Sequence, residues 1–339
     1  MCKKTKFWLL LASCLILCGA LLFGGVMFFL KWNFLKLGTV EMQTKTYEVS
    51  EAFSSISVDV KNADVAFLPS DTDVCRVVCY ENVKCTHAVE VVEGTLRVSA
   101  TDQRKWYDHI KFGSVTPLIQ VYLPIGQYEA LQVRGRTGDV GIPKDFSFAS
   151  IDVQVTTGDV NCFASAVGEM KLKATTGDLF VENVSAGSLS CSVTTGDVTL
   201  NGVQCTGDMS VSAGTGDINF NGVSCNDLTT SVSTGDTRMT DVSCNNLSIS
   251  GKTGDVLLKN VLAAQKLTVQ QSSGDVSFDA CDAAEIFIKL TTGDVTGTLR
   301  SDKTFIVSST TGHVQYPNTV GGTCEIKVTT GDVALDILR

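Results

Sequence analysis

The stretch "VTTGDVTL" at residues 193–200 decides the fold because its turn recurs along most of the chain. Gly-Asp, or a close copy of it, returns every 19 or 20 residues. The repeat-turn glycines are Gly138, Gly158, Gly177, Gly196, Gly216, Gly235, Gly254, Gly274, Gly293, Gly312 and Gly331. A period this short and this regular is typical of proteins that stack one structural unit on the next.

Apolar residues alternate with polar ones on both sides of the turn. Leu189, Cys191 and Val193 precede Gly196, while Val198 and Leu200 follow it. This period of two predicts two short strands, each with one buried face. A third apolar point at the seventh position after the glycine, such as Val203, brings the chain around to the next copy. Each repeat is therefore one coil.

We predict an all-β fold, a single-stranded parallel β-helix-like β-solenoid of about eleven coils of 19–20 residues with an amino-terminal β cap. Residues 37–130 form the linker and irregular β capping region, in which "NADV" at 62–65 looks like a degenerate first turn. Residues 131–339 form the repeat domain. Because the chain stops eight residues after Gly331, we expect an uncovered carboxyl-terminal coil that could pair with another molecule.

The fourth position after each turn glycine forms a further column. With the coils stacked in sequence order, Gly297 is expected between Phe278 and Tyr316, where a small residue makes room for its aromatic neighbours.

Residues 1–36 are predicted to form a cytoplasmic tail and a transmembrane anchor. Residues 7–30 are 24 residues without a charge, enough for a helix to cross a ~30 Å hydrocarbon layer. Lys3, Lys4 and Lys6 favour an inside amino end, so we expect a single-pass cell-membrane protein with most of the chain extracellular. Lipoprotein cleavage at "LASC", residues 11–14, is the less favoured alternative, because it would leave sixteen apolar residues on the mature protein.

The part beyond the helix is acidic. Residues beyond 36 carry 22 basic and 36 acidic side chains, a net charge of −14. Nucleic acid and anionic lipid are therefore disfavoured as partners.

Aspartate follows the turn glycine in ten of eleven copies, with His313 as the exception. Stacked carboxylates repel one another, which local amide hydrogen bonds or a bound cation could offset. The candidate cation ladder comprises Asp159, Asp178, Asp197, Asp217, Asp236, Asp255, Asp275 and Asp294. The two-glycine "GxD" spacing of calcium-binding β-helical repeats is missing, so the hydrogen-bonded corner is favoured and calcium is the alternative.

The cysteines follow the repeat. Cys205, Cys225 and Cys244 share the ninth position after a turn glycine, which predicts a stack of free or partly buried thiols at one corner. Around residues 75–87, the spacing of Cys75, Cys79, Cys85 and His87 matches no familiar zinc pattern, and Cys75, Val77 and Cys79 alternate like one face of a strand. We predict no cofactor and no metal site there.

Catalytic patterns are few. The chain has three histidines, no Gly-x-Ser-x-Gly and no phosphate loop, so we predict a protein that is not an enzyme and assign no catalytic residues. Residues 104–109, "RKWYDH", are the one aromatic and charged cluster in an expected loop and form a candidate contact patch.

Taken together, "VDVKNADVAFLPSD", "EGTLRVSA", "LIQVYLP" and the serial "TTGDV" turns resemble a bacterial family of unknown function whose members are called "putative adhesins" with β-strand repeats. The resemblance covers about residues 50–339. It implies an envelope protein with an exported β-solenoid, in some members associated with cell-envelope stress systems, and supplies no catalytic residues.

The expected function is an adhesin-like or cell-envelope-associated binding scaffold, with a cell-wall, glycan or protein ligand on the solenoid walls. The alternative is a structural envelope protein that self-associates by stacking through open solenoid ends.

Overall fold

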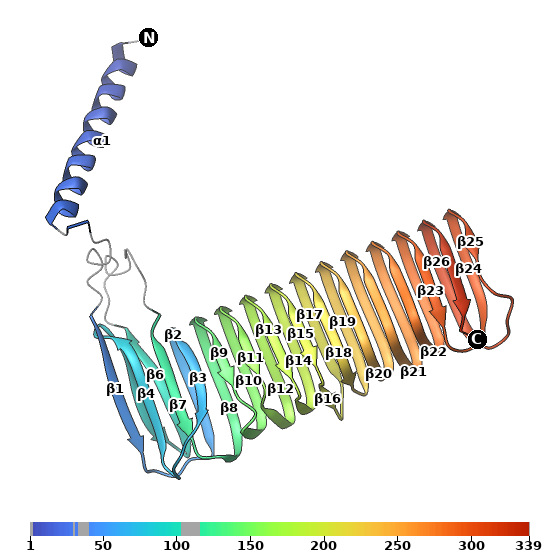
Figure 1. Ribbon diagram of the computed structural model, residues 1–339, viewed down its shortest axis with the longest axis horizontal. Helices are drawn as coiled ribbons and strands as arrows, with labels where there is room; N and C mark the ends of the chain where they lie inside the picture. The colour runs from blue at the N-terminus through green and yellow to red at the C-terminus, as the bar shows by residue number, and fades with distance from the viewer. Residues whose placement is uncertain (1–2, 30, 33–40, 103–115, 339) are drawn as a thin grey trace.

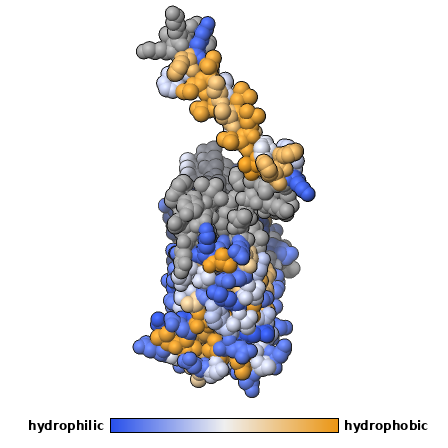
Figure 2. Space-filling view, turned by 90° about the vertical axis from the view of Figure 1, so that its left-hand side faces the viewer, coloured by the Kyte–Doolittle hydropathy of each residue, from blue (hydrophilic) through white to orange (hydrophobic). Residues whose placement is uncertain are grey.

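The computed structural model describes residues 3–29, 31–32, 41–102 and 116–338. It consists of one helix followed by a long stack of β coils (Figure 1). Helix α1 (Lys3–Phe29) is apolar all round beyond Lys6, and its segment Thr5–Phe29 is long and apolar enough to cross a membrane. Figure 2 contrasts its apolar surface with the mostly hydrophilic end of the β region that faces the viewer.

Each coil places one strand before the turn and one after it, as the alternating sequence predicts. Strands before the turn form a first wall: β2 (Ser55–Asn62), β8 (Gly126–Thr137), β10 (Phe146–Thr157), β12 (Ser165–Thr176), β14 (Ser185–Thr195), β17 (Met209–Thr215) and β19 (Asp227–Thr234). Strands after the turn form a second wall: β3 (Asp64–Pro69), β9 (Val140–Ile142), β11 (Val160–Cys162), β13 (Leu179–Glu182), β15 (Val198–Asn201) and β18 (Ile218–Ser224).

Farther along, the chain passes from the second wall of one coil to the first wall of the next within one long strand. These strands are β20 (Thr237–Thr253), β21 (Val256–Ser273) and β22 (Val276–Thr292). The short β16 (Gln204–Cys205) lies on the third side of its coil. The far end of the stack, called the distal end below, contains β23 (Val295–Leu299), β24 (Lys303–Thr311), β25 (Val314–Gln315), β26 (Gly322–Thr330) and β27 (Val333–Ile337).

Neighbouring coils pair in parallel and in register, which lines up identical positions of the repeat. Leu172 pairs with Cys191, and Cys191 with Val211, and all three are buried. Val203, at the predicted third apolar point, is buried as well. The β-solenoid is therefore confirmed, with a core built from columns of aliphatic side chains.

The proximal end, next to α1 in the chain, is covered by antiparallel strands. They are β1 (Met42–Val49), β4 (Cys75–Asn82), β5 (Cys85–Val92), β6 (Thr95–Asp102) and β7 (Leu118–Leu123). β4 pairs with β1 and β7, while β5 pairs with β6. Strands β2 and β3, which lie within the predicted cap region, instead form a solenoid coil that pairs with β8 and β9.

At the distal end, the prediction of an uncovered carboxyl-terminal coil is wrong. β26 pairs with β22 on one side and β24 on the other, and β27 lies between β23 and β25. The last coil in the sequence is therefore the penultimate one in space. Its inward residues Cys324, Ile326 and Val328 are all apolar, whereas the outermost coil has Ser309 at the position that pairs with Val328, so the more apolar coil lies inside.

The same reversal changes the surroundings of Gly297. Its strand partners are Phe278 and Leu335, not Tyr316 as expected from the sequence order. Its φ is 123°, and a Cβ would collide with the carbonyl oxygen of Phe278. Close backbone approach, rather than room for two aromatic rings, explains this glycine.

Candidate functional site

The repeat-turn glycines form a closely packed edge along the whole solenoid. All eleven have φ between 130° and 153°, a region that other residues rarely adopt. The backbone N–H of Gly196 donates to Thr215 of the next coil at 2.9 Å. A Cβ on Gly196 would collide with the carbonyl oxygen of Gly177 in the preceding coil. Glycine is required here by the spacing of the coils as well as by the turn.

The aspartates after these glycines form a continuous chain of hydrogen bonds. The Oδ1 atom of each accepts the backbone N–H of its counterpart in the next distal coil, at 2.7–3.0 Å. The chain starts at Asp64, contains all eight residues of the predicted cation ladder together with Asp139 and Asp332, and ends where His313 donates to Asp332.

The electrostatics of the edge are modified at one place. Arg238 bridges Asp217 and Asp236, with N–O distances of 2.7 and 2.6 Å. The backbone N–H of Asp236, and then Arg238, lower the pKa of Asp217. Amide donors thus satisfy one oxygen of each carboxylate, and Arg238 binds the second oxygen of Asp217 and of Asp236. The cation ladder stays a prediction, in which the second oxygens of the other aspartates are the ligands.

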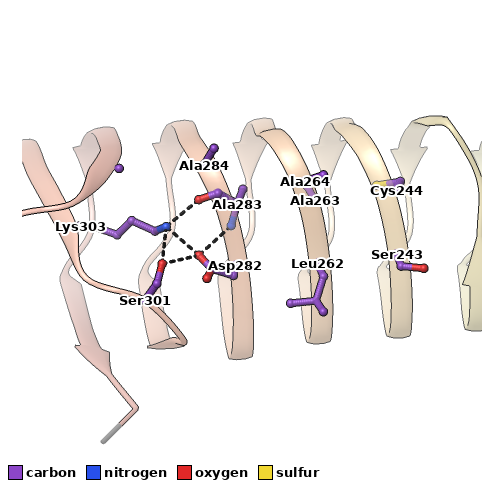
Figure 3. A pocket seen from close by; sticks show the side chains of 11 residues that line it. Ser243, Cys244, Leu262, Ala263, Ala264, Asp282, Ala283, Ala284, Ser301 and Lys303 are labelled. Carbon is purple, nitrogen blue, oxygen red and sulfur yellow. Dashed lines mark hydrogen bonds and ion pairs between the residues drawn. The ribbon is translucent and has the colours of Figure 1, made fainter.

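A groove of about 640 Å³ follows another corner near the distal end (Figure 3). Small residues such as Ala263 and Ala283 line it, and Lys303 lies at its end. The Nζ of Lys303 contacts Asp282 Oδ1 at 2.6 Å, the Ala283 carbonyl oxygen at 2.6 Å and Ser301 Oγ at 2.8 Å. Its side chain is only 2% exposed. All three ammonium donors are therefore used within the protein.

Lys303 also explains how the outermost coil (β24 and β25) is held against the inserted coil, which consists of β26 and β27. It pairs along the strands with Gly322 of the inserted coil, yet its ammonium reaches past that coil to Asp282. The Nζ lies 3.6 Å from where a Gly322 Cβ would stand. The outermost coil is thus linked across its neighbour by an ion pair in which Lys303 is buried and Asp282 is partly exposed. Lys303 could not be identified from the sequence, because nothing along the chain shows that residues 282 and 303 meet.

A second buried polar cluster lies in the proximal cap. The ligand atoms of Cys79, Glu81 and His87 lie within 4.8 Å of one another, and all three residues are buried. The carboxylate of Glu81 accepts the backbone N–H of His87 at 2.6 Å and lies 2.8 Å from His87 Nδ1. Lys45 Nζ and Gln43 Nε2 contact its other oxygen at 3.3 and 3.2 Å.

These contacts give Glu81 a structural role, because its charge is balanced and both oxygens have donors. Cys79, Glu81 and His87 are nevertheless the described residues that come closest to a metal-ligand set. Sequence reasoning missed Glu81, although its inward position in the alternation Val77, Cys79, Glu81 was a usable signal.

The corner cysteines Cys205, Cys225 and Cys244 carry free thiols, with Cys225 the most exposed of the three. Burial raises the pKa of Cys205 to about 11 and the pKa of Cys244 to about 12. These thiols are poor nucleophiles at neutral pH. The candidate contact patch at residues 104–109 lies outside the described residues.

With the coils and their edge established, comparison with protein families gives a clear result. The model of the Toastrack DUF4097 family matches residues 53–221 and 206–338. The chain belongs to this family. The Toastrack matches together take in the coils and the proximal cap apart from its strand β1.

Among solved structures, the chain is similar to a "putative adhesin" from Bacteroides fragilis, with 13% identity, coverage of 89% of this chain and 99% of that one, and a TM-score of 0.33. It is similar to a "putative adhesin" from Parabacteroides distasonis, with 14% identity, 88% and 98% coverage, and a TM-score of 0.38. A "putative lipid binding protein" from the same species has 14% identity, 88% and 97% coverage, and a TM-score of 0.37. No curated protein matches the chain.

Proposed function

We propose that the protein is a non-enzymatic, membrane-anchored extracellular rod that binds an envelope ligand along its side walls. One observation carries the proposal: the strands repeat in register from coil to coil, so outward side chains recur at regular steps of about 4.8 Å. A surface that repeats in this way suits a ligand that repeats, such as a cell-wall polymer.

The chemistry of the first wall favours a neutral glycan. Eight hydroxyl side chains align there in two rows across four coils, and we call them the hydroxyl wall: Ser190, Ser210, Thr229 and Ser248 in one row, and Ser192, Ser212, Ser231 and Ser250 in the other. Ser212 Oγ already contacts Ser192 Oγ at 3.0 Å. Hydroxyls both donate and accept, as sugar hydroxyls do.

The anchor in this proposal is α1. Its apolar segment precedes the solenoid, and Lys3, Lys4 and Lys6 at its amino end favour a cytoplasmic amino terminus. The solenoid then projects from the extracellular side of the membrane, with its antiparallel cap nearest the bilayer.

The test is binding of the full chain, reconstituted in lipid nanodiscs, to purified cell-wall polysaccharide in a pull-down. We expect retention of the wild type and at least a tenfold loss in the double variant Ser192→Glu and Ser231→Glu, which places charge in the hydroxyl wall (about 1.4 kcal/mol). The matched control is Thr199→Glu and Asn219→Glu on the second wall, which should bind like the wild type. Equal retention of both double variants, or no retention of the wild type, contradicts the proposal.

A further inference from the structure

The distal end of the solenoid has an open edge. Among the described residues, β24 pairs only with β26, and β25 only with β27. The outer backbone groups of this coil are therefore available for pairing with another strand.

This edge lacks the charged residues that usually protect an edge strand. Residues 304–324 contain no Asp, Glu, Lys or Arg. Lys303, the first residue of β24, is turned inward and buried. By contrast, β1 at the proximal end carries Lys45 and Glu48. Natural edge strands use such charges to prevent association, and the distal coil is without them.

The distal end also uncovers part of the apolar core. Phe305, Val307 and Val314 occupy inward columns but are only partly buried, whereas their neighbours Ile326 and Val333 in the next coil are fully buried. Ile306, on the outer side of β24, is 57% exposed. A covering surface would have to be apolar and uncharged.

The row of turn aspartates limits which surface of another molecule can cover the distal coil. His313 donates its backbone N–H to Asp332 but has no carboxylate to accept from a further coil, so the hydrogen-bonded corner ends there. The proximal end of another copy is closed by antiparallel strands and bears charges. Head-to-tail stacking is therefore disfavoured at both surfaces.

We propose that the distal end binds the distal end of a second copy, head to head about a twofold axis, with the two β24 strands pairing antiparallel. Each end then supplies the uncharged, apolar surface that the other needs. This inference rests on the proposed function for one point only, namely that the distal end faces away from the membrane. Copies anchored in two facing membranes could then meet through their distal ends.

The test uses the full chain at one copy per nanodisc, followed by sedimentation velocity at rising concentration. We expect wild-type discs to form pairs and no larger species. Ile306→Lys places two ammonium groups near the twofold axis and should weaken pairing at least tenfold (about 1.4 kcal/mol). Leu257→Lys, which changes an exposed leucine on the wall of an internal coil, should pair like the wild type. Circular dichroism checks that both variants fold.

Wild-type discs that stay single up to about 100 µM would overturn the proposal and leave the edge to a strand of another protein. Pairing of Ile306→Lys as tight as that of the wild type would also overturn it, as would growth into long polymers. The outcome is independent of polysaccharide retention, so failure of the proposed function and failure of this inference are distinguishable.

Discussion

Glycine and aspartate at the turn have separate tasks. The glycine allows a backbone conformation and an approach of neighbouring coils that no side chain permits. The aspartate links its corner to the next coil through one carboxylate oxygen. Substitutions at the two positions should therefore have different effects. Any side chain at the glycine position should destabilise the fold, whereas at the aspartate position a side chain that keeps an acceptor atom should be tolerated.

Gly196→Ala should lower the free energy of unfolding by about 1–3 kcal/mol, because alanine is strained at a φ of 139° and its Cβ collides with Gly177. Chemical denaturation monitored by circular dichroism measures the change. Gly141→Ala is the control: no atom lies within 4 Å of its added Cβ, so its stability should stay the same or rise slightly. Equal effects at the two positions would contradict the account of the turn.

Asp197→Asn should keep most of the stability, whereas Asp197→Ala should lose about 1 kcal/mol, because only the amide variant retains an acceptor for the Asp217 N–H. Denaturation in calcium-free buffer compares the three proteins. A rise in the wild-type Tm with calcium that both variants diminish would instead favour the cation ladder.

At the scale of elements, register makes each position of the repeat a column. The corner cysteines illustrate the consequence, because Cys205, Cys225 and Cys244 recur at one position yet remain thiols. Desolvation is the largest cause of their raised pKa values, so packing rather than reactivity accounts for them.

These three cysteines should react slowly with iodoacetamide at pH 8 in the folded protein, because the raised pKa values leave little thiolate. After unfolding in urea without a reductant, all three should be alkylated within minutes. Peptide mass spectrometry reports each site. Protection that persists after unfolding and disappears with a reductant would show a disulfide and contradict the free-thiol column.

At the scale of the whole molecule, both ends reverse the order of the chain. At the proximal end, the β2–β3 coil lies between the cap strands β6 and β7, with which it pairs in parallel, and the later β8–β9 coil. At the distal end, the last coil is inserted beneath an earlier one and fastened by Lys303. The two ends therefore differ, with one closed by a cap and the other bearing an uncharged edge.

The distal reversal predicts unequal effects at two equivalent positions. Val333 and Val314 both lie two residues after a turn glycine, but Val333 is buried and Val314 is partly exposed. Val333→Thr should cost about 1–3 kcal/mol, because it buries a hydroxyl, and Val314→Thr should cost less. Thermal unfolding of the two variants compares their losses of stability. If the last two coils were stacked in sequence order, Val314→Thr would cost more than Val333→Thr.

Much of the fold could be predicted because the deciding signals are local. The turn needs glycine, the alternation defines two buried strand faces, and a fixed period aligns both into columns. The candidate site was harder to predict from the sequence. The ladder aspartates could be identified by position, but their amide donors lie one coil away, and Glu81 meets Lys45 only after the cap folds.

The sequence by itself determined the coil, its turn, its core columns and the apolar helix, because each depends on residues within one repeat or one segment. Only the tertiary structure decided the order of coils at the two ends, the ion pair between Lys303 and Asp282, and the uncharged distal edge. The physical reason is that every coil has nearly the same shape and can stack on any other. Which coils become neighbours is therefore decided by burial and charge across the whole stack, and not by the period of the repeat.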